Sequence, residues 1–356
     1  LTGAFEYKRL SASFTAGQTI HGNNHTLRNY DLFLKLGNGP GDWKVGMGQI
    51  DRHWSPSQYT SLILSKNASA FHSAYLRKST PTQIDLPVLR WLGPWDGEFF
   101  LGTTSDTRQP DDALIMGMRL RLRPSDNLEI DFVRTAQWGG AGRSQSFGTL
   151  ANIILGDTNV GSAGEANQVA GVGISYTLPN LAKGTRLYAQ AVGEDESGGT
   201  PSCFMYLGGI EMDVPLFGIA SQVTLEHVDT RIAESRNGFC GPNTAYNNSI
   251  YSYAQRGSSL GAAIDSEGSS TSLRVKHDLQ EMIFEWSIGH YQINDASAAN
   301  HRLSSTRVQG AVVTAGISRE IFGGIASALV VYQGFGLDTA GFEAGTRLGI
   351  GFSKSF

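Results

Sequence analysis

The sequence has little charge, few cysteines and no long apolar run, and each shortage excludes a class of protein. Charged residues make up 17% of the chain, whereas soluble proteins average about 25%. Lys and Arg total 28 against 32 Asp and Glu, so the chain lacks the basic surface that a nucleic-acid-binding protein needs. No stretch approaches the about 18 apolar residues of a membrane-spanning helix.

Two further shortages concern cysteine and the start of the chain. Cys203 and Cys240 are the two cysteines, which is too few for a disulfide framework or a cysteine-rich metal site. The sequence begins at Leu1 without an initiator methionine, as cleavage of a signal peptide or truncation would leave it.

Glycine is abundant, at 44 of 356 residues, or about 12% against a usual value of about 7%. Helical periodicity is scarce, and apolar and polar residues alternate along many segments. Together with the low charge, this leaves two classes: a soluble all-β protein, such as a β-sandwich, or a transmembrane β-barrel.

The clearest alternation predicts a hairpin at residues 113–132 with one apolar and one charged face. Its apolar face holds Leu114, Met116, Met118, Leu120, Leu122, Leu128, Ile130 and Phe132. The same pattern recurs in residues 30–36, 43–47, 172–178, 222–226, 272–277 and 282–288.

The connections between these segments alternate in length. Short ones are predicted at residues 37–42, 124–127, 179–184, 215–218, 278–280 and 321–324. Long polar ones are predicted at residues 54–81, 139–167, 193–202, 230–270, 294–306 and 336–345. Short turns at one end and long loops at the other are typical of bacterial outer-membrane barrels, and a β-sandwich does not explain them.

The last strand supports the same interpretation. Leu348, Ile350 and Phe352 alternate with small or polar residues, and the printed sequence stops at Phe356. Such a strand is similar to the closing strand that the barrel-assembly machinery recognises. We therefore expect residues 1–356 to form a single antiparallel outer-membrane β-barrel domain. Because unpaired backbone groups are costly in hydrocarbon, an even number of strands is expected, about 16 or 18. Residues 246–266 have room for one further hairpin, from segments 250–255 and 260–265.

Charged residues opposite the apolar faces would then line the barrel interior. We predict that they form cross-strand pairs that fix the strand register, in preference to a basic ladder for an anionic solute. These residues are Arg119, Arg121, Arg123, Glu129, Asp131, Arg274, Lys276 and Glu285.

From residue 52 to residue 138 the sequence resembles the Wzi family of outer-membrane capsule-attachment proteins. The strings that carry this resemblance are Trp54-Ser55-Pro56, Ser61-Leu62-Ile63-Leu64-Ser65-Lys66-Asn67-Ala68, Leu86-Pro87-Val88-Leu89-Arg90, Arg123-Pro124-Ser125-Asp126-Asn127-Leu128-Glu129 and Arg134-Thr135-Ala136-Gln137-Trp138-Gly139-Gly140. The resemblance implies an 18-stranded barrel that is closed by its loops and acts as a lectin for group 1-type capsular or related exopolysaccharide. Family members also carry an N-terminal helical segment on the periplasmic side, which is not evident here, because the sequence opens with strand-like residues such as Phe5 and Tyr7.

Long loops with aromatic and arginine side chains suit such a ligand. Aromatic rings stack on sugars, and the guanidinium fork of arginine binds carboxylated sugars bidentately. The candidate carbohydrate-binding residues are Arg52, Trp54, Tyr59, Trp138, Arg143, Tyr246, Tyr251, Tyr253 and Arg256. Packing within a folded loop is the alternative for each of them. Cys203 and Cys240 would both face an oxidising exterior, where a disulfide between them would pin the largest loop.

The predicted function is therefore attachment of capsular polysaccharide by a monomeric protein in the outer membrane, in contact with lipid and lipopolysaccharide and without a cofactor or metal. A porin or substrate-specific channel shares the fold and remains the main alternative. A hydrolase is a weaker one, since Gly257-Ser258-Ser259-Leu260-Gly261 matches a nucleophile motif but lies in a chain without the α/β pattern that this motif needs.

Overall fold

The structure, a computed structural model, consists almost entirely of β-strands. It describes residues 2–7, 9–18, 25–36, 42–155, 166–179, 184–197, 200–236 and 239–354. The first strands are β1 (Thr2–Tyr7), β2 (Leu10–Gln18), β3 (His25–Leu36), β4 (Trp43–Gln49), β5 (His72–Thr82), β6 (Trp95–Thr104), β7 (Ala113–Ser125), β8 (Leu128–Trp138), β9 (Asn167–Thr177) and β10 (Arg186–Ser197). They are followed by β11 (Thr200–Leu216), β12 (Ile219–Asp229), β13 (Ala254–Gln255), β14 (Ser258–Ser259), β15 (Ser269–Asp278), β16 (Met282–Ile293), β17 (Val308–Ile321), β18 (Gly324–Gln333) and β19 (Gly345–Ser353).

Among the described residues, 17 of these strands belong to one sheet. An even number of 16 or 18 was expected, and 17 lies between these two values without matching either. The predicted all-β class is confirmed. Neighbouring strands pair antiparallel in chain order, from β1 to β8 and again from β11 through β12, β15, β16, β17 and β18 to β19. β13 and β14 pair only with each other in a separate hairpin.

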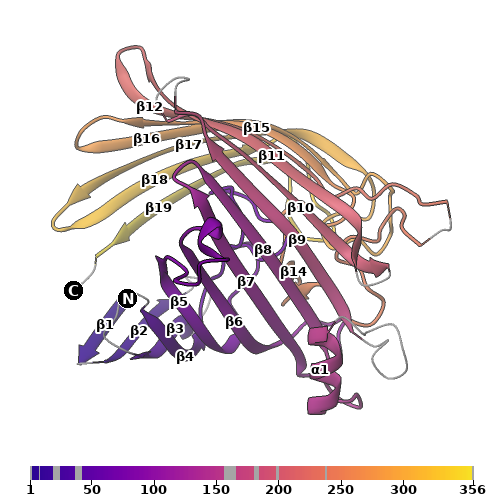
Figure 1. Ribbon diagram of the computed structural model, residues 1–356. Helices are drawn as coiled ribbons and strands as arrows, with labels where there is room; N and C mark the ends of the chain where they lie inside the picture. Colours follow the sequence, from indigo (N-terminus) through magenta and orange to yellow (C-terminus); the bar gives the residue numbers. More distant parts are fainter. Residues whose placement is uncertain are drawn as a thin grey trace. The chain divides into compact units, whose positions relative to one another are not determined.

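Figure 1 labels these strands along the chain. The chain forms two compact units. Unit 1 contains Leu1–Ile174, Gln190–Phe204 and Tyr246–Ala263, and unit 2 contains Ser175–Ala189, Met205–Ala245 and Ile264–Phe356. In the part of the chain that the structure describes, no helix is long and apolar enough to span a membrane.

The two faces of the strands have the alternation that the sequence predicts. In unit 1, Leu101, Leu120 and Phe132 lie exposed on one face of β6–β8, which we call the outer face. Arg119 and Asp131 lie on the opposite, inner face. In unit 2, the register aligns the exposed Ile288, Val313 and Tyr332 on one face of β16–β18, and Leu348, Ile350 and Phe352 of β19 are exposed as well.

Four predicted connections differ from the structure. Residues 193–202 do not form a long loop, because β10 continues to Ser197 and β11 begins at Thr200. The predicted loop 54–81 ends early, because His72–Thr82 forms β5; only Ala74 and Leu76 give its outer face an apolar character, so the alternation is weak. The loop between β8 and β9 contains a helix, α1 (Phe147–Leu155). Residues 250–265 add no hairpin to the large sheet, because β13 and β14 take part in the loop packing described below.

A short 3-10 helix, η1 (Arg90–Leu92), lies between β5 and β6. The predicted turns at residues 37–42 and 179–184 lie largely outside the described residues, and so does Phe356.

Candidate functional site

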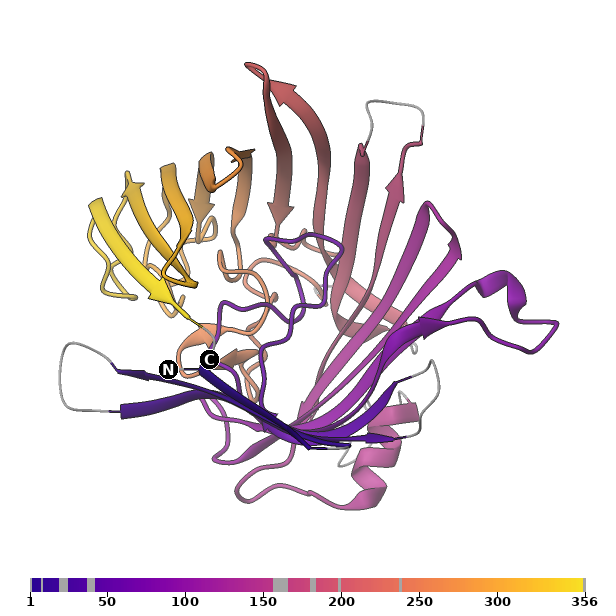
Figure 2. The ribbon, with the colours of Figure 1, turned by 90° about the vertical axis from the view of Figure 1, so that its left-hand side faces the viewer.

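The β4–β5 loop, residues 50–71, packs against the inner face of unit 1. Its Trp54 is 2% exposed, and its ring lies 5.5 Å from the ring of Phe100 on β6. Gly117 on β7 makes this packing possible, because an added Cβ would lie 2.2 Å from Phe100 Cε1 and 2.9 Å from Trp54 Cη2. The segment around Trp54 is therefore part of a packed interior. Figure 2 shows this loop on the concave side of the unit 1 strands.

A second segment, residues 246–262 of the long β12–β15 connection, packs on the β4–β5 loop. We call these two segments together the loop plug. The Tyr246 hydroxyl donates to the carbonyl oxygen of Leu62 at 2.7 Å, and the Tyr253 hydroxyl donates to that of Ile63 at 2.8 Å. The two tyrosine rings stack with centroids 5.7 Å apart. Backbone groups that would otherwise be buried without partners are thus satisfied.

The loop plug is also bonded to the strands behind it. Thr135 Oγ1 on β8 and the Tyr253 hydroxyl are 2.7 Å apart. The Tyr251 hydroxyl donates to the carbonyl oxygen of Gly139 at 2.9 Å, and the Gln190 side chain on β10 donates to the carbonyl oxygen of Trp54 at 2.7 Å. Burial in this plug raises the pKa of the Tyr253 hydroxyl, so this group remains a hydrogen-bond donor at neutral pH.

The β13–β14 hairpin presents an arginine at its tip. Arg256 has a φ of 50° and Gly257 a φ of 83°, a pair of left-handed residues that suits a two-residue hairpin turn. The Asp106 carboxylate holds this turn by accepting a hydrogen bond from the Gly257 N–H at 2.7 Å, and the Arg256 N–H donates to the carbonyl oxygen of Ser105 at 2.8 Å. The Arg256 side chain is exposed.

Other polar side chains surround this tip. Arg108 Nη1 donates to Asn247 Oδ1 at 3.2 Å. Asn67 donates from its side chain to the carbonyl oxygen of Ser259 at 2.9 Å, and both Asn67 and its neighbour Lys66 are exposed. Sequence reasoning missed Arg108, Asn67 and Asn247, because a polar loop residue carries no periodic signal. We call Lys66, Asn67, Arg108, Asn247 and Arg256 the polar rim.

A cavity of about 320 Å³ lies between the β4–β5 loop and the inner faces of β5, β6 and β7. A buried carboxylate in its wall, Glu98, is shared by two arginines. Arg52 Nε donates to Glu98 Oε1 at 2.8 Å, and Arg77 Nε donates to Glu98 Oε2 at 3.1 Å. The Arg52 guanidinium carbon also lies 4.0 Å from the ring centroid of Phe100. Arg52 is therefore a structural link between the loop and the strands.

Ion pairs continue along the inner face. The Arg119–Asp131 pair is 2.6 Å long, Arg123 lies 3.1 Å from Glu129, and Arg121 lies 3.0 Å from Asp96. In unit 2, Arg274 lies 2.8 Å from Glu285, while Lys276 is opposite Glu285 in the register. These are the cross-strand contacts that the sequence predicts, with Asp96 as a further carboxylate on β6.

The nine candidate carbohydrate-binding residues separate by burial. Six are buried: Arg52, Trp54, Trp138, Tyr246, Tyr251 and Tyr253. Trp138 lies on the outer face, where it packs with Met116, Ala136 and Ile153 of α1. Tyr59 and Arg143 are half-buried, and the Arg143 guanidinium lies 5.7 Å from the ring centroid of Tyr251. Arg256 is the member of the nine that is exposed.

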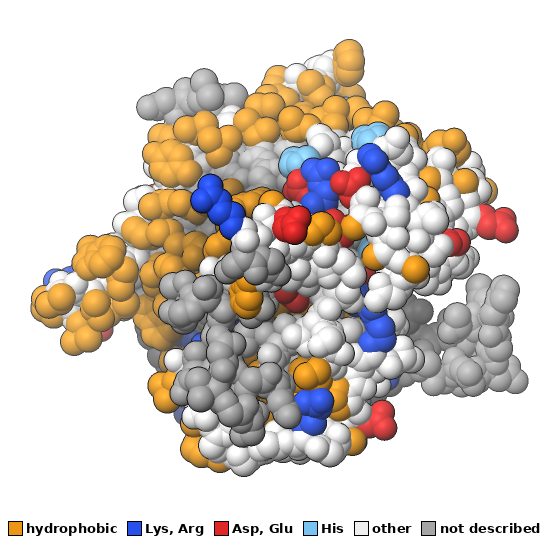
Figure 3. All heavy atoms as spheres, turned by 90° about the vertical axis from the view of Figure 1, so that its right-hand side faces the viewer, with side chains coloured by type: hydrophobic (Ala, Val, Ile, Leu, Met, Phe, Trp, Pro, Cys, Tyr) orange, Lys and Arg blue, Asp and Glu red, His pale blue; other side chains and the backbone are white. Residues whose placement is uncertain are grey.

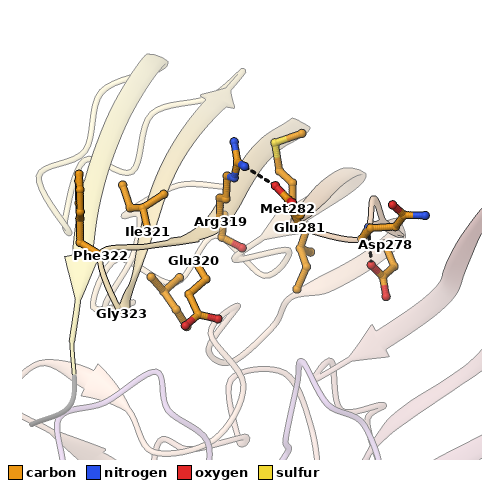
Figure 4. A pocket seen from close by; sticks show the side chains of 12 residues that line it. Asp278, Glu281, Met282, Arg319, Glu320, Ile321, Phe322 and Gly323 are labelled. Atoms are coloured by element: carbon orange, nitrogen blue, oxygen red, sulfur yellow. Dashed lines mark hydrogen bonds and ion pairs between the residues drawn. The ribbon is translucent and has the colours of Figure 1, made fainter.

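Three remaining features bear on function. Cys203 and Cys240 are both disulfide-bonded. In the part of the chain that the structure describes, no three His, Cys, Asp or Glu side chains gather into a metal-binding group. Unit 2 has a pocket between the β15–β16 and β17–β18 turns, where Arg319 pairs with Glu281 (Figure 4). It lies at the short turns and contains none of the predicted site residues.

The chain matches a family profile and a curated relative. The family profile described as capsule assembly protein Wzi matches residues 4–312. A Klebsiella pneumoniae relative, described as an uncharacterized 55.8 kDa protein in the cps region, is 34% identical over 169 residues, which cover 47% of this chain and 34% of the relative. The match thus spans about a third of that curated relative.

Two solved structures share the fold. One is Wzi of Escherichia coli, an outer-membrane protein involved in group 1 capsule assembly and a carbohydrate-binding β-barrel, with a TM-score of 0.71, 21% identity and coverage of 99% of this chain and 80% of that chain. The other is the outer-membrane protein OprD of Pseudomonas aeruginosa, with a TM-score of 0.52, 9% identity and coverage of 97% and 82%.

The fold is therefore that of an outer-membrane β-barrel. Within this class, the profile match across most of the sequence shows that the chain belongs to the capsule assembly protein Wzi family. The resemblance seen in residues 52–138 is thus confirmed.

Proposed function

We propose that this protein binds capsular or related exopolysaccharide at the cell surface and holds it on the outer membrane. The observation that carries the proposal is the loop plug of unit 1, which is joined by hydrogen bonds to the strands and ends in the polar rim, where Lys66, Asn67 and Arg256 are exposed. Family membership supports it, because the Escherichia coli relative is a carbohydrate-binding barrel.

The chemistry of the polar rim suits an acidic polysaccharide. Arg108, Arg256 and Lys66 supply positive charge, and the amides of Asn67 and Asn247 supply both donors and acceptors for sugar hydroxyls. The clamp of Asp106 on the hairpin turn fixes the backbone beneath Arg256, so less conformational entropy is lost when a ligand binds. Tyr59 and Arg143, both half-buried, are the sequence-predicted residues that we keep as further contacts. Figure 3 shows scattered Lys, Arg, Asp and Glu side chains on the face of the molecule that it draws.

Packing supports a different role for the six buried candidates. Trp54, Tyr246, Tyr251 and Tyr253 have no free ring face for a sugar, and we propose that they position the polar rim. Arg52 ties the β4–β5 loop to Glu98, and Trp138 supports α1.

The test compares binding of a panel of purified capsular polysaccharides to the detergent-purified protein and to an Arg108→Ala/Arg256→Ala variant. We expect the variant to bind the preferred polysaccharide at least tenfold more weakly while keeping its heat-modifiable mobility on gels. The control variant Arg319→Ala removes an exposed arginine at the opposite strand ends and should bind normally. If the rim variant binds as well as the control does, the polar rim is not the site.

We further propose that the protein is neither a channel nor an enzyme. The loop plug covers the inner face of β5–β8, which argues against an open diffusion path, and low conductance in planar bilayers is the expected result. Ser259 is 3% exposed and lies on β14, and its hydroxyl accepts a hydrogen bond from the Gly261 N–H at 3.1 Å. This setting differs from the strand-to-helix turn of a hydrolase nucleophile.

The exposed apolar residues of β19 support the proposal that the barrel-assembly machinery recognises this strand. A Leu348→Asn/Ile350→Asn variant should therefore accumulate unassembled in the periplasm, which fractionation of cells would reveal.

A further inference from the structure

The helix α1 lies on the outer face of unit 1, which is the lipid-facing side of an outer-membrane barrel. Its Ile153 is fully buried, and together with the partly buried Leu150 it packs on Met116 and Ala136 of the neighbouring strands β7 and β8. The register places these two strand residues on the same face as the exposed Leu120 and Phe132. The helix therefore replaces lipid over the cell-surface end of this wall and continues its apolar surface.

The free side of the helix has a composition that is unusual for contact with water. Phe147 is 83% exposed and Leu155 is 81% exposed, and Ile154 beside Leu155 is 41% exposed. No residue from Phe147 to Leu155 carries a charge. A surface helix in water typically has charged or polar residues opposite its buried stripe.

Backbone groups at both ends of the helix have hydrogen-bond partners, as they need where water is excluded. At the N-terminus, the Thr149 N–H donates to the Ser146 hydroxyl oxygen at 3.1 Å. At the C-terminus, Arg134 on the outer face of β8 donates to the carbonyl oxygens of Ile153, at 2.6 Å, and Ile154, at 3.1 Å. These carbonyls have no partner within the helix, and unsatisfied backbone groups are costly where water is excluded.

The same contacts explain an arginine on the lipid-facing side. Arg134 also donates from Nε to Gln168 Oε1 of β9 at 3.0 Å. Charged side chains on the outer face of a barrel destabilise it, and less so near the interface than at the midplane. The helix end and Gln168 together surround the guanidinium, so that α1 and Arg134 stabilise each other.

From these observations we propose that α1 is a membrane-contacting helix, whose Phe147 and Leu155 insert among the acyl chains at the outer-leaflet interface beside the barrel. This contact would extend the lipid-facing surface that the exposed apolar residues of β6–β8 form. This inference is independent of polysaccharide binding.

The experiment places a fluorescent NBD group at Phe147→Cys or Leu155→Cys in the full chain, reconstituted in dioleoylphosphatidylcholine vesicles. Because Cys203 and Cys240 are disulfide-bonded, labelling without reductant is directed to the new cysteine, and the wild-type protein measures the background. Thr107→Cys, exposed in the polar β6–β7 loop at the same end of the strands, is the control site. Leu120→Cys on the outer face is the reference for full lipid contact.

Vesicles with acyl chains brominated near the glycerol end report the result. We expect bromine to quench the labels at 147 and 155 at least twofold, as at 120, and to leave the label at 107 unquenched. Quenching at 147 and 155 as weak as at 107 would overturn the proposal. A blue-shifted but unquenched label that changes with protein-to-lipid ratio would also overturn it, since a second copy would then cover the helix. Heat-modifiable mobility of each labelled protein verifies that the barrel is folded.

Discussion

The Tyr253 hydroxyl donates a hydrogen bond of 2.8 Å to the carbonyl oxygen of Ile63, which lies 190 positions earlier in the chain. This bond joins the two segments of the loop plug, and Thr135 on β8 extends it to the strands. The Tyr253 hydroxyl thus connects the β4–β5 loop, the segment 246–262 and strand β8. Removing it tests whether this connection stabilises unit 1.

We predict that Tyr253→Phe lowers the free energy of unfolding by about 1–2 kcal/mol, because buried backbone acceptors lose a donor. The freed β4–β5 loop should also be cut faster by trypsin at the exposed Lys66. Unfolding in urea with phospholipid vesicles and timed proteolysis measure the two effects. Tyr332→Phe, on the exposed apolar face of β16–β18 and 48% exposed, is the matched control. Equal free energies of unfolding and equal cleavage rates for the two variants would show that the Tyr253 hydrogen bond does not stabilise the loop plug.

Gly117→Ala should disturb the packing of the loop plug on β7. The added Cβ would lie 2.2 Å from Phe100 Cε1, so the Phe100 and Trp54 rings must shift, at a cost of about 1–3 kcal/mol. The near-ultraviolet circular dichroism of the aromatic groups should change. Gly349→Ala is the control, since that strand glycine has its nearest neighbour atom at 3.9 Å from the added Cβ. An unchanged aromatic signal in the Gly117→Ala variant would contradict the packing described for Trp54.

Because two arginines share the Glu98 carboxylate, we predict that Glu98→Gln destabilises the protein more than Arg52→Leu does. Glu98→Gln leaves two arginines beside a neutral side chain, and loss of one partner of a buried ion pair costs about 3–5 kcal/mol. Arg52→Leu should cost less, because Glu98 remains paired with Arg77 at 3.1 Å. Free energies of unfolding of the two variants in urea decide the order. A larger loss of unfolding free energy in the Arg52→Leu variant than in the Glu98→Gln variant would mean that Arg77 does not neutralise Glu98.

Glu267, in the loop between β14 and β15, predicts a pH dependence. Burial raises the pKa of this carboxyl, and Asp295 nearby raises it further. A raised pKa means that the folded protein binds a proton more readily than the unfolded one does. Its contribution to stability is therefore present at low pH and is lost as pH rises above the ordinary glutamate value of about 4.3 and through the raised value.

Glu267→Gln keeps an oxygen acceptor for the Asn243 N–H, which donates to Glu267 Oε1 at 2.8 Å, and removes the titration. We expect a higher unfolding temperature than wild type at pH 8 and a smaller difference at pH 5. Glu281→Gln, at an exposed turn, controls for the loss of a carboxylate. A wild-type protein that is more stable than the Glu267→Gln variant at pH 8 would reverse the assigned sign.

Alternation and loop length were sufficient to predict the all-β class, the barrel and the two faces of the hairpin at residues 113–132. The strand His72–Thr82 was missed because its inner face carries Ser73, Tyr75 and Arg77 and its outer face has little apolar content. The helix α1 was missed because a nine-residue apolar segment between glycine-rich stretches resembles loop composition.

The candidate site was harder to predict, for a physical reason. Aromatic residues in long loops suit both sugar stacking and packing, and burial decides between the two. Long-range hydrogen bonds such as that from Tyr246 to Leu62 determine the burial, and no local pattern encodes them. The contacts of Arg108 and Asn67 depend on the same tertiary arrangement.

The turn at Arg256 and Gly257 is held through its backbone, by the Asp106 carboxylate and the Ser105 carbonyl oxygen. The side chain at position 256 takes no part in that clamp. Residues that tolerate a left-handed backbone, such as Asn or Asp, can therefore replace Arg256 and change the charge at the hairpin tip without loosening the turn.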